Sequence, residues 1–233
     1  MAIKPFLAMT AAEFHAAPSL PEKVAWMACH FSPYGRGLSN LPEFLPANSL
    51  LILNDRIPVH GHDPEQICQQ LTTTLSNHHC HGLLLDFQRP NCEDTAKIVR
   101  YLWEASGLPV AVSEAYAGQT SGPVFLPPLP HHIPLEEYIA PWKEREIWLE
   151  LALDGEKLTL TESGFSVIPV SSPNFSEGSH AEQALHCHYH MALKETEAEF
   201  IFWRTTEDMD SLMEEAQLLG IRNVVGLYQE FFI

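Results

Sequence analysis

The sequence alternates between short apolar runs and longer polar stretches, and this alternation restricts the fold more than any other feature. The runs are rich in Val, Ile, Leu and Phe. Continuous runs of this kind are typical of strands that are buried on both faces, as in a parallel sheet covered by helices. The runs that we assign to strands are 24–31, 49–54, 82–87, 109–113, 123–126, 147–153, 200–203 and 223–228.

Three of the intervening stretches have helical character. The stretch 63–76 opens with Asp-Pro-Glu, whereas the stretches 93–106 and 207–219 end at Gly107 and Gly220. Proline in the first helical position and glycine just after the last one are usual helix boundaries. Parallel strands that are joined by helices make right-handed crossovers. About eight such strands predict a single α/β domain over residues 1–233, a small (β/α)8 barrel of the TIM type.

The second half of this barrel is predicted to be trimmed. Between about residues 118 and 194 prolines accumulate and helical stretches become rare, so loops or hairpins are expected to replace some helices. One hairpin is predicted over 148–161 around Asp154-Gly155, because Asp-Gly supplies the positive φ angles of a tight turn. A second hairpin is predicted to join residues 186–193 to residues 199–205.

The charge of the chain excludes two classes of partner. Against 13 Lys and Arg stand 30 Asp and Glu, which gives a formal net charge of −17. Such a chain is repelled by nucleic acid and by anionic membranes. No apolar run approaches the roughly 18 residues that span a bilayer, and Glu13 and His15 lie where a secretory signal would be apolar.

The five cysteines include no CxxC pair, which favours free thiols over disulfides or a thiolate zinc site. The sequence therefore predicts a cytoplasmic protein without a metal or cofactor. It gives no indication of the oligomeric state.

Polar residues follow the apolar runs, and in a parallel barrel the carboxyl ends of the strands form the ligand site. The residues around this end of the barrel would supply carboxylates, amides and aromatic side chains, which suit a sugar better than a phosphate. Aromatic faces stack under the sugar, and the polar groups bind its hydroxyls. Polar strand ends also occur in barrels that bind nothing. The candidate ligand-binding residues are His30, Asp55, Asp86, Gln88, Glu114, Tyr116 and Tyr228.

The segment His81-Gly-Leu-Leu-Leu-Asp-Phe-Gln-Arg-Pro90 resembles the signature strand of the family 18 glycoside hydrolases, D-G-x-D-x-D-[WF]-E-[YF]-P, without a gap. Residues 205–212 and 219–228 resemble the closing helix and strand of that family, and residues 182–189 are similar to its spore-cortex-lytic branch. The signature positions that match are Gly82, Asp86, Phe87 and Pro90.

The signature also departs from the family at decisive positions. His81 and Leu84 stand where aspartates are expected, Arg89 replaces an aromatic residue, and Gln88 takes the place of the catalytic glutamate. In the family this glutamate protonates the glycosidic oxygen while the acetamido group of the substrate attacks the anomeric carbon. A carboxamide has no proton to give, and its loss costs roughly 10² to 10⁴ in rate.

The resemblance therefore implies a carbohydrate-binding protein that is inactive by the route of the family. The implied ligand is a glycan of the N-acetylglucosamine type, and spore association is an implied location. Tyr228 lies near the aromatic residue that forms the sugar floor in the family, and an alignment shifted by one residue would place Leu227 there instead.

Two other functions remain open. The chain could be an active glycoside hydrolase in which Asp86 and Glu114 form the pair of carboxylates, with Glu230 as a third candidate. It could also be a metal-dependent hydrolase, because histidines cluster at His60-Gly-His62 and His186-Cys-His-Tyr-His190. In the second cluster, strand alternation would place three imidazoles on one face, where they could bind Zn²⁺.

Overall fold

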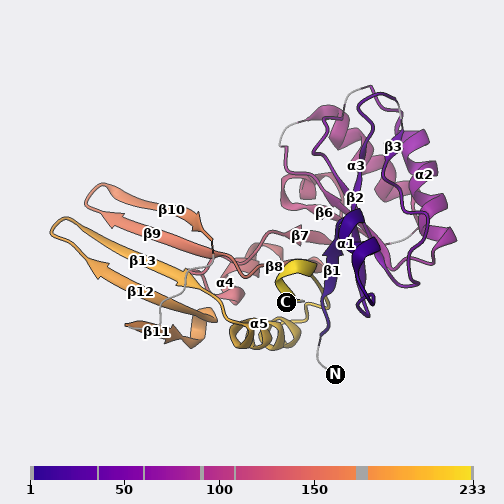
Figure 1. Ribbon diagram of the computed structural model, residues 1–233. Coiled ribbons are helices and arrows are strands. Elements are labelled where there is room, and N and C mark those ends of the chain that lie inside the picture. Colours follow the sequence, from indigo (N-terminus) through magenta and orange to yellow (C-terminus); the bar gives the residue numbers. More distant parts are fainter. Residues whose placement is uncertain are drawn as a thin grey trace. The chain divides into compact units, whose positions relative to one another are not determined.

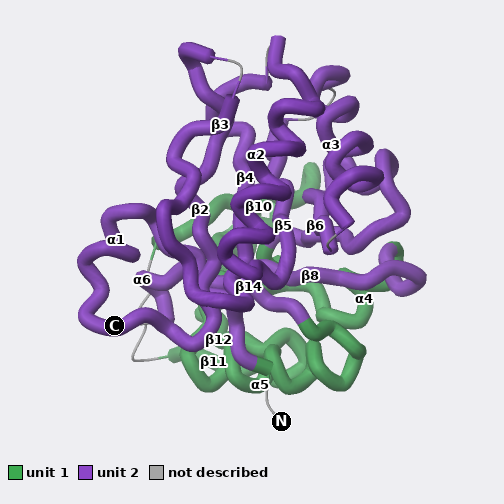
Figure 2. The backbone as a smooth tube through the Cα atoms, turned by 90° about the vertical axis from the view of Figure 1, so that its right-hand side faces the viewer, with its two compact units in different colours: residues 1–3, 128–141, 151–222 green, residues 4–127, 142–150, 223–233 purple. Residues whose placement is uncertain are grey.

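The structure is a computed structural model that describes residues 3–35, 37–59, 61–89, 92–107, 109–171 and 178–231. The chain forms two compact units (Figure 2). Unit 1 contains residues 128–141 and 151–222, and unit 2 contains residues 4–127, 142–150 and the chain from 223 onward. The single-domain organisation over residues 1–233 stays a prediction.

Unit 2 is a closed barrel of eight parallel strands (Figure 1). The strands follow one another around the barrel in the order β1-β14-β8-β7-β6-β5-β4-β2, and the parallel pairing of β1 with β2 closes it. A short strand, β3 (Leu38–Ser39), pairs antiparallel with the end of β2. The barrel strands are β1 (Phe6–Met9), β2 (Val24–Phe31), β4 (Leu50–Asn54), β5 (Gly82–Asp86), β6 (Val110–Ser113), β7 (Val124–Leu126), β8 (Ile147–Leu151) and β14 (Asn223–Leu227).

Two layers of apolar side chains hold the barrel together, because successive side chains on each strand point to opposite faces. The inner layer receives side chains from all eight strands, and Trp148 is its largest fully buried member. The outer layer lies between the strands and the helices, and Leu51, Leu53 and Leu83 belong to it. The run Leu83-Leu84-Leu85 is continuously apolar because side chains on both faces of β5 are buried away from water.

The helices of unit 2 begin and end close to the predicted positions. Helix α2 (Pro64–Asn77) begins after Asp63, whose side chain accepts a hydrogen bond from the N–H of Glu65, and helix α3 is Glu93–Ala105. After β6 the chain makes only a 3₁₀ helix, η1 (Glu114–Gln119). Short helices α1 (Ala11–Ala16) and α6 (Tyr228–Phe231) follow β1 and β14. The prediction of a trimmed (β/α)8 barrel is confirmed.

One predicted barrel strand is wrong. The run 200–203 lies in β13 (Glu197–Trp203), which pairs in the sheet of unit 1. The barrel is completed by β1 instead, in a segment to which the sequence assigned no strand, and all four residues of β1 are buried. A four-residue apolar run carries the same local signal in both places, so periodicity could not distinguish them.

Unit 1 is built on an antiparallel sheet with the strand order β10-β9-β13-β12-β11 (Figure 1). The second predicted hairpin is confirmed by the pairing of β12 with β13. The hairpin around Asp154-Gly155 is wrong, because β8 stays in the barrel and β9 pairs with β10 across a turn at residues 162–163. The remaining elements of unit 1 are β9 (Gly155–Thr161), β10 (Gly164–Val170), β11 (Ser179–Glu182), β12 (Cys187–Leu193), η3 (Gln183–Leu185), α4 (Leu135–Ile139) and α5 (Thr206–Leu218). The 3₁₀ helix η2 (Ala140–Trp142) follows α4 directly.

A partly buried group of one acid and two histidines makes unit 1 sensitive to acid. Burial lowers the pKa of His131 below 6.5. Burial alone would raise the pKa of Glu156, but hydrogen bonds from His131 and His132 outweigh it and lower that pKa to about 2. Both groups therefore bind protons more readily in the unfolded chain, so their stabilisation is present at neutral pH and is lost on acidification.

We expect the free energy of unfolding to fall as the pH drops below 6.5, and again between pH 4.5 and about 2. The Glu156 contribution is on the order of 2 kcal/mol. Urea unfolding at stepped pH, followed by circular dichroism, measures it. The variant Glu156→Gln should lose the lower part of this pH dependence, whereas Glu162→Gln, in an exposed turn, should keep it. Equal pH dependence in the two variants would contradict the assignment.

None of the described helices is both long enough and apolar enough to cross a membrane. None of the five cysteines forms a disulfide.

Candidate functional site

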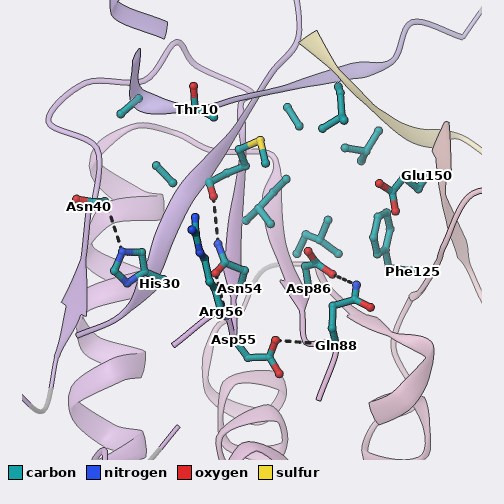
Figure 3. A pocket seen from close by; sticks show the side chains of 18 of the residues that line it. Thr10, His30, Asn40, Asn54, Asp55, Arg56, Asp86, Gln88, Phe125 and Glu150 are labelled. Atoms are coloured by element: carbon teal, nitrogen blue, oxygen red, sulfur yellow. Dashed lines mark hydrogen bonds between the residues drawn. The ribbon is translucent and has the colours of Figure 1, made fainter. Parts of the chain in front are cut away.

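A cavity of about 910 Å³ lies at the carboxyl ends of the barrel strands, entirely within unit 2 (Figure 3). Asn54 and Asp86 are the last residues of their strands, and Thr10 directly follows β1. Apolar side chains from inside the barrel, including Leu84 and Phe125, form part of its wall. The polar residues that line the cavity are Thr10, His30, Asn40, Asn54, Asp55, Arg56, Asp86, Gln88, Arg89 and Glu150.

Asp86 and Gln88 lie side by side in this cavity. The carboxamide nitrogen of Gln88 donates a hydrogen bond to Oδ1 of Asp86. Burial raises the pKa of Asp86, the hydrogen bond from Gln88 lowers it, and the charge of Asp55 raises it, with a net rise. This hydrogen bond uses one of the two N–H groups of the amide, so Gln88 keeps its second N–H and its carbonyl oxygen for hydrogen bonds to a ligand.

Asp55 fixes the backbone that carries Gln88. It is only 4% exposed, and its two carboxylate oxygens accept hydrogen bonds from the backbone N–H groups of Gln88 at 3.0 Å and Arg89 at 2.9 Å. The guanidinium of Arg89 in turn donates to the carbonyl of Arg56. The end of β5 is therefore held against the end of β4, and Asp55 positions the signature segment.

An irregularity in β2 shapes the neighbouring wall. The register of β2 against β4 shifts between Trp26 and Cys29. The side-chain amide of Asn54 donates to the carbonyls of Met27 and Cys29 at 3.2 and 3.0 Å, so the bulge leaves neither acceptor unsatisfied. The continuous apolar run 24–31 gives no sign of this bulge.

His30 has a defined orientation beside the cavity. Its Nδ1 lies 2.8 Å from the carbonyl of Phe31 and its Nε2 lies 3.2 Å from the side-chain amide of Asn40. These two contacts hold the imidazole ring between the backbone of β2 and the side chain of Asn40.

The structure brings together four of the seven residues selected from the sequence: His30, Asp55, Asp86 and Gln88 line the cavity. The other three do not line it. Glu114 is exposed at the start of η1. The buried hydroxyl of Tyr116 donates to the carbonyl of Arg89 and accepts from the N–H of Cys92, so it supports the loop after β5. Tyr228 packs against the outer core, and its neighbour Leu227 lines the cavity.

Sequence reasoning missed Glu150, which lines the same cavity from β8. It is the only carboxylate within the apolar run 147–153, and a lone charged residue in a buried strand was the available signal. Arg56 and Arg89 also line the cavity. Pro90, the last matching residue of the signature, lies outside the described residues.

The histidine clusters do not form a metal site in the described part of the chain, where no three His, Cys, Asp or Glu side chains are arranged to hold an ion. His186 precedes β12 and has a left-handed backbone, so it is not part of the strand alternation. Its ring contacts Ser211 and Glu215, and the ring of His188 contacts Asp208 at 2.9 Å. His60 lies outside the described residues.

Comparison with known proteins gives matches among solved structures alone. No protein-family model and no curated protein matches the sequence. A family 18 N-acetylglucosaminidase from Paenibacillus barengoltzii matches with a TM-score of 0.58 and 9% identity, over 97% of this chain and 96% of that one. The chitinase-like agglutinin of Robinia pseudoacacia matches with a TM-score of 0.57 and 12% identity, over 94% and 93%.

The spore cortex-lytic enzyme SleL of Bacillus cereus matches with a TM-score of 0.53 and 9% identity, over 96% of this chain and 70% of that one. At these identities the likeness establishes the fold. The chain has a barrel like that of the family 18 glycoside hydrolases.

Proposed function

We propose that this chain binds a glycan of the N-acetylglucosamine type in the barrel cavity and does not hydrolyse it by the family 18 route. One observation carries the proposal. The residue at the signature position of the catalytic acid is Gln88, and its carboxamide lies in the cavity, hydrogen-bonded to Asp86.

The lining of the cavity supports a sugar ligand. Carboxylates, amides and the Thr10 hydroxyl lie on a partly apolar wall, which suits the mixed polar and apolar surface of a pyranose ring. The chitinase-like agglutinin among the similar structures is a protein of this fold that is named for a binding activity. The cytoplasmic location, the spore association and the lack of nucleic-acid and membrane partners stay predictions from the sequence.

Calorimetric titration with N-acetylglucosamine oligosaccharides tests the proposal. We expect Asp86→Ala to weaken binding by roughly 10- to 100-fold, because a hydrogen bond to a charged group contributes about 1.5–3 kcal/mol. Glu114→Ala removes an exposed carboxylate outside the cavity and should leave binding unchanged. Binding that is absent from the unmodified chain, or equally reduced in both variants, would contradict a sugar site in this cavity.

A second candidate is an active glycoside hydrolase. It is favoured by Glu150, which lines the same cavity as Asp86, whereas Glu114 does not. The raised pKa of Asp86 is of the kind that a general acid needs. Chromatography of oligosaccharides incubated with the protein decides between the two functions. Turnover that is lost in both Asp86→Ala and Glu150→Gln would establish the hydrolase and refute the inactive protein.

A further inference from the structure

Two arginines line the barrel cavity, although a neutral sugar needs no cation to bind it. Arg56 follows the end of β4, and Arg89 follows the end of β5. Arg89 also stands at the signature position where the family 18 glycoside hydrolases carry an aromatic residue. The cation at position 89 is therefore a feature of this chain and not part of the family pattern.

The guanidinium of Arg89 reaches across to the end of β4. Its Nη2 donates a hydrogen bond to the backbone carbonyl of Arg56 at 2.9 Å. Both side chains are exposed. Because a guanidinium has five N–H donors, this one hydrogen bond leaves most of the donors of Arg89 available to a ligand. Two cationic side chains thus start from the same part of the cavity wall.

The charged side chains of the cavity separate into two sides, as Figure 3 shows. Arg56 lies beside His30 and Asn54, on the side that β2 and β4 form. The carboxylates of Asp86 and Glu150 lie on the other side, which runs from β5 through β6 and β7 to β8. The cavity therefore has a cationic side at β4 and an anionic side between β5 and β8.

The carboxylate of Asp55 also lies at the end of β4, but it faces the backbone. It is 4% exposed, and its two oxygens accept hydrogen bonds from the N–H groups of Gln88 and Arg89. Within the described residues, neither Arg56 nor Arg89 forms an ion pair with a carboxylate. An anionic ligand on the cationic side would therefore meet guanidinium donors that no carboxylate of the described chain has taken.

The charge of the surroundings favours a carboxylate as that anion. A guanidinium binds a carboxylate through two parallel N–H···O bonds. A carboxylate carries one negative charge, whereas a phosphate monoester carries about 1.5 to 2 at pH 7. The net charge of −17, with Asp86 and Glu150 in the same cavity, repels the larger charge more strongly.

We propose that Arg56 and Arg89 bind a carboxylate on the glycan, so that the cavity takes an acidic amino-sugar glycan in preference to a neutral one. This inference rests on the glycan function proposed above. The carboxylate would lie on the cationic side, and the hydroxyl and amide groups of the sugar would lie against Asp86 and Gln88.

Calorimetric titration with three disaccharides tests the inference. The neutral one consists of two N-acetylglucosamine rings, the second adds a lactyl ether with its carboxylate to one ring, and the third joins N-acetylglucosamine to glucuronic acid. We expect an acidic disaccharide to bind at least about 10-fold more tightly than the neutral one, or about 1.4 kcal/mol. The tighter of the two shows whether the carboxylate belongs to an ether substituent or to a uronate ring. Added salt should reduce the preference, because it screens exposed charges.

Arg56→Gln and Arg89→Gln remove the two charges one at a time. Each should reduce the ratio of acidic to neutral affinity by about 10-fold, because hydrogen bonds to charged groups are lost. Arg56→Lys keeps the charge without the planar fork and should reduce the ratio less than Arg56→Gln. The matched control is Arg100→Gln, an exposed position on α3 that does not line the cavity, and it should leave the ratio unchanged. Circular dichroism should show equal folding in all variants.

Three results would overturn the carboxylate site and leave the glycan function intact. The neutral disaccharide could bind at least as tightly as both acidic ones. The acidic preference could survive in both glutamine variants as it does in the control. The neutral disaccharide with a 6-phosphate could bind more tightly than either carboxylate, which would assign the arginines to a phosphate. A chain that binds none of the disaccharides overturns the glycan function itself.

Discussion

A chain with the substitution Gln88→Glu is expected to hydrolyse N-acetylglucosamine oligosaccharides about 100-fold faster than the unmodified chain, at the lower end of the range for general acid catalysis. A carboxyl group at this position carries the proton that the carboxamide lacks. Burial already raises the pKa of the neighbouring Asp86, and the same surroundings would favour the protonated form of the introduced carboxyl group. Leu84 stays apolar, so the gain should be limited.

The measurement is the rate of product formation by chromatography, made at saturating oligosaccharide so that binding does not limit the rate. Gln88→Met is the matched control, because it keeps the length of the side chain and supplies no acid. A Gln88→Glu chain that binds oligosaccharide but forms product no faster than Gln88→Met would mean that the missing acid is not what prevents hydrolysis.

The second large effect concerns stability. Asp55→Ala is expected to lower the free energy of unfolding by about 3 kcal/mol, because the N–H groups of Gln88 and Arg89 lose the buried carboxylate that accepts hydrogen bonds from both. Glycan binding should fall with it, since the segment that carries Gln88 loses its anchor.

Urea denaturation measures the loss of unfolding free energy. The variant Asp55→Asn tests how much of it depends on the number of oxygen acceptors. Asparagine keeps one oxygen acceptor, so about half of the destabilisation should remain. Asp63→Ala removes only the side-chain cap of α2 and should cost about 1 kcal/mol. If Asp55→Ala costs no more than Asp63→Ala, the two backbone hydrogen bonds are not what holds the segment.

Most of the barrel could be predicted because its strands are dry on both sides. A run such as Leu50–Asn54 is apolar at nearly every position, and the helix α2 that follows it has a clear N-terminal cap at Asp63. β1 was not predicted because it is only four residues long and is followed almost directly by helix α1, so the apolar residues of the two elements could not be separated. The run 200–203 was wrongly assigned to the barrel, because aromatic residues of the unit 1 sheet also make a continuous apolar run there.

The candidate site was predictable where a local pattern marked it. Asp86 and Gln88 were found through the signature segment, and both line the cavity. Glu150 was not found, because its place in the cavity depends on the barrel closing between β8 and β14, which are far apart in the sequence. Glu114 was selected as a strand-end residue, but the chain turns into η1 directly after β6 and leaves it exposed.

The connection between β8 and β14 has a consequence for how the barrel folds. These strands are neighbours in the sheet, although β8 ends at Leu151 and β14 begins at Asn223. Until β14 is in place, β8 and β1 each present an unpaired edge, and such edges promote association with other unfinished chains. Closure is a non-local step, because residues 152–222 lie between the two strands in the sequence and belong to unit 1, and non-local pairing is slow. On the ribosome, the barrel therefore stays open until the chain has been translated through Leu227.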